Sequence, residues 1–115
     1  MKSGNSIYVP DRGDIVYLNF SPHRGREQGY ERPAIVLSPL RYNRMANLAL
    51  MCPITNQSKG LRFEVPLIEG MQTTGVVLSD QIKSFDMLAR SARFVEKAPT
   101  ELVEEVLAKV ETLLT

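Results

Sequence analysis

The sequence predicts a mainly β domain with a C-terminal helix. Six short segments rich in β-branched and aliphatic residues precede a single segment whose apolar residues recur at helical spacing. The chain has 115 residues, of which 43% are apolar and 23% charged, and these values fit one compact globular domain over residues 1–115. We expect residues 1–8 to form a flexible N-terminus.

The expected strands differ in how their apolar residues are distributed. In 15–20, alternation places Val16, Leu18 and Phe20 on one face of the strand. The segments 34–38 and 48–53 are apolar on both faces, so the sheet either curls into a barrel or meets a second subunit. The remaining expected strands are 63–67, 75–82 and the short segment 93–95.

Asp80 interrupts the pattern of the fifth expected strand. Alternation places its carboxylate on the same face as Val76, Leu78 and Ile82. A carboxylate on an apolar face needs hydrogen bonds or a cation, so Asp80 is either a structural anchor or a catalytic group. We favour the anchor.

The segment from Thr100 to Leu114 predicts an amphipathic helix that packs on the sheet. Pro99 and Thr100 mark its start, and acidic residues fill its first turn, as the helix dipole prefers. Its expected buried stripe consists of Leu102, Val103, Val106, Leu107, Val110, Leu113 and Leu114.

Composition excludes several classes of protein. The single cysteine, Cys52, rules out an internal disulfide, and with only His23 beside it the chain lacks a cluster of metal ligands. No apolar run approaches the roughly 20 residues of a membrane span, and the N-terminus lacks a secretion signal, so we expect a cytoplasmic protein. Residues 1–62 carry nine basic and four acidic residues, whereas residues 63–115 carry five basic and nine acidic residues. One surface of the protein could therefore be positive despite the small net charge.

Two polar segments are candidates for function. Residues 21–33 form a 13-residue connection rich in charged groups, whereas connections usually run about 4 to 6 residues and long ones tend to bind or catalyse. Alternatively, residues 21–33 form a solvated flexible loop whose charges only keep the protein soluble. Residues 55–60 follow a buried strand and offer hydroxyls, amides and a cation, which suit a phosphate backbone or an exposed RNA base.

Four runs carry a family resemblance: R-G-D-I-V at 12–16, G-R-E-Q-G-Y-E-R-P-A-I-V-L-S at 25–38, P-I-T-N-Q-S-K-G at 53–60 and G-V-V-L-S-D-Q-I-K-S at 75–84. In order and spacing they resemble the MazF/PemK/Kid toxins of bacterial toxin–antitoxin modules, from about residue 8 to the C-terminus. The resemblance implies an SH3-like small β-barrel and a homodimer. It also implies an endoribonuclease that cuts single-stranded mRNA at short sequences without a metal or other cofactor, and that a MazE/PemI-like antitoxin inhibits.

The resemblance also assigns site residues. Arg32 matches the family's catalytic arginine, Thr55 its active-site threonine and Glu27 its loop glutamate. A guanidinium and a hydroxyl suit the negative charge that builds on phosphorus when the RNA's own 2′-hydroxyl attacks. Glu27 is either the base for that hydroxyl or a residue that positions the arginine. The expected RNA-binding residues are Arg24, Arg26, Gln28, Asn56, Gln57, Ser58, Lys59, Gln81 and Lys83.

Two other functions are compatible with the same fold. Gyrase-poisoning toxins of the CcdB type share this barrel and cut no RNA, so the fold alone does not exclude them. A passive RNA-binding barrel would show the same salt-sensitive affinity without cleavage. The E-Q-x-x-x-R-P loop and the P-I-T segment favour the nuclease.

Overall fold

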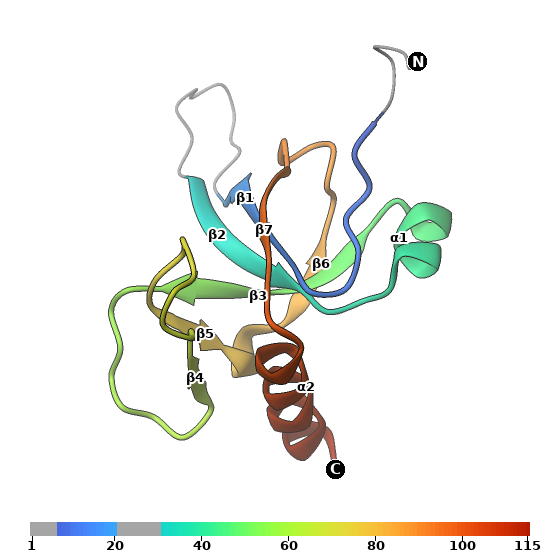
Figure 1. The fold of residues 1–115 in the computed structure, drawn as a ribbon. Coiled ribbons are helices and arrows are strands. Elements are labelled where there is room, and N and C mark those ends of the chain that lie inside the picture. Colours follow the sequence, from blue (N-terminus) through green and yellow to red (C-terminus); the bar gives the residue numbers. More distant parts are fainter. Residues whose placement is uncertain (1–6, 21–30) are drawn as a thin grey trace.

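A computed structural model of the protein describes residues 7–20 and 31–115. Its antiparallel sheet has the strand order β4-β5-β3-β2-β1-β7, with β6 paired to β3. The prediction of a mainly β fold with a C-terminal helix is confirmed (Figure 1). The elements in chain order are β1 (Asp14–Asn19), β2 (Glu31–Val36), α1 (Leu40–Ala46), β3 (Ala49–Thr55), β4 (Glu64–Pro66), β5 (Val76–Leu78), the 3-10 turn η1 (Ser79–Gln81), β6 (Lys83–Phe85), β7 (Arg93–Lys97) and α2 (Thr100–Leu114).

The sheet has a hydrophobic cluster on each face, which explains why its central strands are apolar on both sides. Alternate residues of β1 go to different clusters, with Val16 and Leu18 in one and Ile15 in the other, as predicted. Strand β2 divides in the same way between Ala34 and Ile35. Because residues of the same chain cover both faces, the pattern by itself no longer calls for a second subunit.

Helix α2 covers one of the two clusters with the first part of its apolar stripe. Leu102, Val103, Val106 and Val110 are buried there and Leu107 packs at the margin, as predicted. Leu113 and Leu114 are 51% and 76% exposed, so the stripe ends earlier than expected. The helix lies alongside β4 and η1, and α1 sits at a separate corner of the molecule (Figure 1).

Strand β2 begins at Glu31, three residues before the expected start at residue 34. The cause is pairing with β1, in which Asn19 faces Glu31 and Leu18 faces Arg32. Arg32 therefore lies on a strand rather than in the long connection between the first two strands. A side chain on a strand is held more rigidly than one on a loop.

The expected strand over 75–82 is wrong beyond Leu78, because the chain turns there into η1. The turn breaks the two-residue alternation, so Ser79 is buried and the Asp80 side chain is exposed instead of lying among apolar residues. Asp80 therefore does not need the buried anchoring partner that alternation suggested.

The N-terminal segment is joined to the sheet through Asp14, which is buried. The hydroxyl of Tyr8 donates to Asp14 at 2.6 Å and the ammonium of Lys97 donates to it at 2.9 Å. Burial, followed by this contact with Asp14, raises the pKa of the Tyr8 hydroxyl above its usual range. Among the described residues, no helix has the length and apolar character needed to cross a bilayer.

Candidate functional site

Arg32 and Thr55 come together at one end of neighbouring strands. Arg32 is on β2, and Thr55 is the last residue of β3. The two strands are antiparallel, with Ala34 opposite Pro53. Because Arg32 lies two residues before Ala34 and Thr55 lies two residues after Pro53, the register brings them to the same end of the sheet. The structure thus brings together two of the three predicted catalytic residues.

Two pockets meet at this pair of residues. The larger pocket has a volume of about 760 Å³ and the smaller about 340 Å³. Arg32, Thr55 and Gln57 line both pockets, so they form the boundary between them. The other residues of the larger pocket are Tyr17, Glu31, Pro33, Ile54, Asn56, Gln72, Thr73, Thr74, Arg93 and Val95, and those of the smaller are Lys59, Leu61, Phe63, Glu64, Leu78, Asp80 and Gln81.

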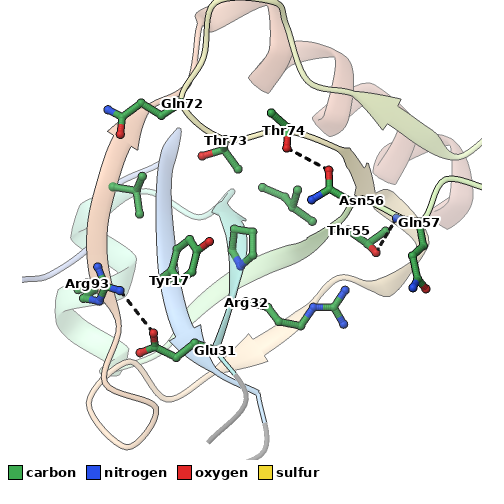
Figure 2. A pocket seen from close by; sticks show the side chains of 13 residues that line it. Tyr17, Glu31, Arg32, Thr55, Asn56, Gln57, Gln72, Thr73, Thr74 and Arg93 are labelled. Atoms are coloured by element: carbon green, nitrogen blue, oxygen red, sulfur yellow. Dashed lines mark hydrogen bonds and ion pairs between the residues drawn. The ribbon is translucent and has the colours of Figure 1, made fainter.

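The larger pocket is the open mouth of the curled sheet, continuous with the cluster beneath α2. Tyr17 lies two positions after the buried Ile15 on β1, and Pro33 lies two positions before the buried Ile35 on β2, so they share the faces of those residues. Ile54 belongs to the cluster and also lines the pocket. The pocket therefore has an apolar floor and a polar rim (Figure 2).

The segment after β3 is held by its own hydrogen bonds. The Thr55 hydroxyl accepts a hydrogen bond from the backbone N–H of Gln57 at 3.1 Å. Further on, Glu64 accepts from the Ser58 hydroxyl at 2.8 Å and from the backbone N–H groups of Lys59 and Gly60. The Lys59 and Ser58 contacts lower the pKa of Glu64 below its ordinary value. These hydrogen bonds attach the loop after β3 to Glu64 of β4.

A second loop, residues 71–75, lies against the end of β3. The Thr74 hydroxyl donates to the side-chain oxygen of Asn56 at 3.0 Å (Figure 2). The backbone of Gly75 is so close to Thr55 that an added Cβ would lie 2.3 Å from the Thr55 carbonyl oxygen. Residues 71–75 therefore restrict where Thr55 and Asn56 can lie.

Two arginines face the larger pocket in different surroundings. The Arg32 guanidinium carbon lies 6.0 Å from the centre of the Phe20 ring. The Arg93 guanidinium lies 5.2 Å from the centre of the Tyr17 ring, and Arg93 forms an exposed 3.4 Å ion pair with Glu31. Exposed ion pairs of this kind contribute about 0 to 1 kcal/mol. Arg93 can therefore move toward an anionic ligand at little cost.

The predicted RNA-binding residues, together with the predicted catalytic residue Glu27, divide into four groups. Asn56 and Gln57 line the larger pocket, and Lys59 and Gln81 line the smaller one. Ser58 and Lys83 line neither of these pockets. Ser58 donates to Glu64, and the Lys83 ammonium lies 5.4 Å from the Phe85 ring centre. Arg24, Arg26, Glu27 and Gln28 lie outside the residues that the structure describes.

The sequence interpretation missed one wall of the larger pocket. Tyr17, Gln72, Thr73, Thr74 and Arg93 come from β1, from the hairpin between β4 and β5, and from β7. The polar run Gln72-Thr73-Thr74 could have indicated this wall, since it directly precedes an apolar strand, as other polar loops of the site directly follow one. Its proximity to Thr55 depends on the curl of the sheet, which the sequence pattern does not specify.

Cys52 is not a candidate nucleophile. Its side chain is buried in the sheet, and burial, with a smaller effect from the charge of Asp80, raises the pKa of its thiol to about 12. The thiol is therefore protonated at neutral pH. Among residues 7–20 and 31–115, no group of three or more histidine, cysteine, aspartate or glutamate side chains is placed to hold a metal ion.

Comparison with known proteins gives consistent matches. Residues 11–114 match the family described as the PemK-like, MazF-like toxin of type II toxin–antitoxin systems. The chain is 42% identical over 109 residues to the endoribonuclease toxin MazF of Escherichia coli (strain K12), covering 95% of this chain and 97% of MazF. Crystal structures of MazF and of MazE–MazF (Form-II) from Deinococcus radiodurans are 45% and 42% identical, with TM-scores of 0.85 and 0.84. Each match covers 94% of this chain. The match covers 98% of the MazF chain and 97% of the matched chain in the MazE–MazF complex.

Proposed function

This chain belongs to the family of PemK-like, MazF-like toxins of type II toxin–antitoxin systems, and we propose that it is an endoribonuclease that cleaves single-stranded mRNA at short sequences. The observation that carries the proposal is the position of Arg32 and Thr55 at the boundary of two pockets. An RNA strand that occupies both pockets passes this pair. The scissile phosphate then lies beside the guanidinium and the hydroxyl.

Cleavage proceeds by transesterification in this proposal. The 2′-hydroxyl loses its proton and its oxygen attacks the adjacent phosphorus, and the bond from phosphorus to the 5′-oxygen breaks. The departing 5′-oxygen takes a proton from water, so the products carry a 2′,3′-cyclic phosphate and a 5′-hydroxyl. Negative charge accumulates on the phosphoryl oxygens during this step. The Arg32 guanidinium stabilises that charge through two parallel hydrogen bonds, and the Thr55 hydroxyl donates a third. No metal ion takes part in the step.

The proton of the 2′-hydroxyl needs an acceptor, and we assign Glu27 to this part of the site. Its carboxylate either takes the proton or positions Arg32. Arg24, Arg26, Gln28, Asn56, Gln57, Lys59 and Gln81 bind the flanking RNA, and Ser58 and Lys83 also belong to this expected set.

The proposed partners are a MazE/PemI-like antitoxin and a second copy of this chain. A relative has been solved as a MazE–MazF complex, which supports an antitoxin here. An acidic, partly disordered antitoxin segment would compete with RNA for the cations of the site, so its affinity would fall as salt rises. The homodimer would bury about 1,200 to 2,000 Å². Sedimentation at micromolar concentration tests it, and a stable monomer would contradict it.

The gyrase-binding alternative is disfavoured by the relatives, which are endoribonucleases. Product chemistry tests the proposed function against it. Purified protein is incubated with a long single-stranded RNA in excess EDTA, and the fragment ends are mapped. We expect 2′,3′-cyclic phosphate and 5′-hydroxyl ends at a short recurring sequence, and an RNA with a 2′-deoxy nucleotide at the cut site resists cleavage. A requirement for magnesium would rule out the mechanism.

A further inference from the structure

The two ends of the sheet come close to each other without pairing as strands. One end is formed by β4 and β5, and the other end is β7. Between them lies the mouth of the larger pocket, which has Val95 of β7 on its wall together with Gln72 and Thr73. A contact joins these two ends beside the mouth of the larger pocket.

Glu96 of β7 makes that contact. Its carboxylate accepts hydrogen bonds from the backbone N–H of Gln72 at 3.0 Å, the backbone N–H of Thr73 at 2.8 Å and the Thr73 hydroxyl at 2.6 Å. These donors belong to the hairpin loop between β4 and β5, more than twenty positions before Glu96. Three donors on one carboxylate make a strong, directional attachment.

Residues 71–75 transmit this attachment to the proposed catalytic threonine. The loop continues to Thr74, which donates to Asn56, and to Gly75, whose backbone touches the Thr55 carbonyl oxygen. The far side of the loop is fixed as well, because the N–H of Leu67 donates to the carbonyl of Gly75 at 3.0 Å. A shift at position 73 therefore moves Thr55 or strains the contacts between them.

We infer that Glu96 is a positioning residue, which closes the barrel between β7 and the β4–β5 hairpin and thereby sets the position of Thr55 beside Arg32. This inference rests on the proposed RNA cleavage. Glu96 itself lines neither of the two pockets. Glu96 acts through residues 72–75 and touches neither the RNA nor the reacting phosphate. A displacement of about 1 Å at a reacting group can lower a rate by about 100-fold, so a distant carboxylate can matter to turnover.

The decisive variant is Glu96→Gln, which keeps the shape of the side chain and has only one acceptor oxygen. In the variant, one carboxylate oxygen is replaced by an NH2 group, which cannot accept a hydrogen bond. The backbone N–H of Gln72 or of Thr73 therefore loses its acceptor. The matched control is Glu104→Gln on the exposed face of α2. Turnover on single-stranded RNA, the unfolding midpoint, amide exchange at Gln72 and Thr73, and the amide signals of Thr55 and Asn56 are measured for each protein.

We expect Glu96→Gln to lower kcat by about 10- to 100-fold with KM within about twofold, at a temperature where both proteins are folded. Amide exchange at Gln72 and Thr73 should rise by about tenfold or more, and the signals of Thr55 and Asn56 should shift. Glu104→Gln should change none of these. In combination with Thr74→Val, the losses in kcat should be less than multiplicative, because both variants release the same loop.

Faster exchange with an unchanged kcat would overturn the positioning role and leave Glu96 with a structural one. Unchanged exchange and unchanged Thr55 signals would show that Glu96 does not hold the loop. If the unaltered protein cuts no RNA, the proposed function fails, and the Thr55 and Asn56 signals still decide whether Glu96 positions them.

Discussion

Gly75 lies against Thr55 so closely that no side chain fits between them. An added Cβ at position 75 would lie 2.3 Å from the Thr55 carbonyl oxygen, and the backbone there has φ of +116°. That φ is in the left-handed region, which favours glycine. Both the dihedral angle and the contact therefore require glycine at the edge of the proposed active site.

Gly75→Ala should destabilise the protein by about 3 kcal/mol or more, because it adds a clash to backbone strain. Gly70→Ala is the matched control, since Gly70 has φ of +98° with no atom within 4 Å of the added Cβ. Strain alone should cost about 1 to 2 kcal/mol there. Urea unfolding of both variants gives the difference. Equal losses would mean that the contact with Thr55 contributes nothing.

The Thr55 hydroxyl can be tested separately from the shape of its side chain. Thr55→Ser keeps the hydroxyl and should stay within a few-fold of normal turnover, whereas Thr55→Val should lose about 100-fold. Thr112→Val removes a hydroxyl from α2, where Thr112 donates to the Ala108 carbonyl, and should leave cleavage unchanged. Initial rates on single-stranded RNA provide the comparison. Normal turnover in Thr55→Val would remove Thr55 from the catalytic residues.

Glu64 makes the loop after β3 sensitive to acid. Hydrogen bonds from Lys59 and Ser58 hold its pKa below the ordinary value of 4.5. A lowered pKa means that the folded protein binds this proton more weakly than the unfolded chain does. The stabilising effect is therefore complete above pH 4.5 and is lost as pH falls through the lower value in the folded state.

Amide signals of Lys59 and Gly60 should consequently shift with a midpoint below pH 4.5. Glu64→Gln should abolish that transition at both amides, because it removes the titrating group. An NMR titration of the two proteins measures this. A midpoint at or above 4.5 in the unaltered protein would contradict the hydrogen-bonded carboxylate.

Much of the fold could be predicted from local patterns, and the exceptions have physical causes. Helix α1 was missed because it has seven residues, follows Pro39 without a side-chain cap, and buries the polar Asn43. Strand β6 was missed because its sequence, Lys-Ser-Phe, has no β-branched or aliphatic residue. Both elements depend on tertiary contacts: the Asn43 amide of α1 donates to the Pro10 carbonyl, and β6 pairs with β3.

The candidate site could be predicted in part. Arg32 and Thr55 were identified from a family resemblance, and the strand register explains why they meet. The wall formed by Gln72, Thr73 and Thr74 was not predicted, because those residues reach Thr55 only through the curl of the sheet. Asp80 was placed wrongly for a related reason, since the turn at Ser79–Gln81 breaks the alternation on which its position was based.

Arg32 carries RNA cleavage in the proposed mechanism, and single-turnover cleavage of a single-stranded RNA in excess EDTA measures its contribution. Arg32→Ala should lose at least about 100-fold in rate while RNA affinity stays within a few-fold, because the guanidinium acts mainly on the transition state. Arg41→Ala, which removes an exposed guanidinium from α1, should cleave normally. Cleavage by Arg32→Ala at the normal rate would show that Arg32 is not the catalytic arginine.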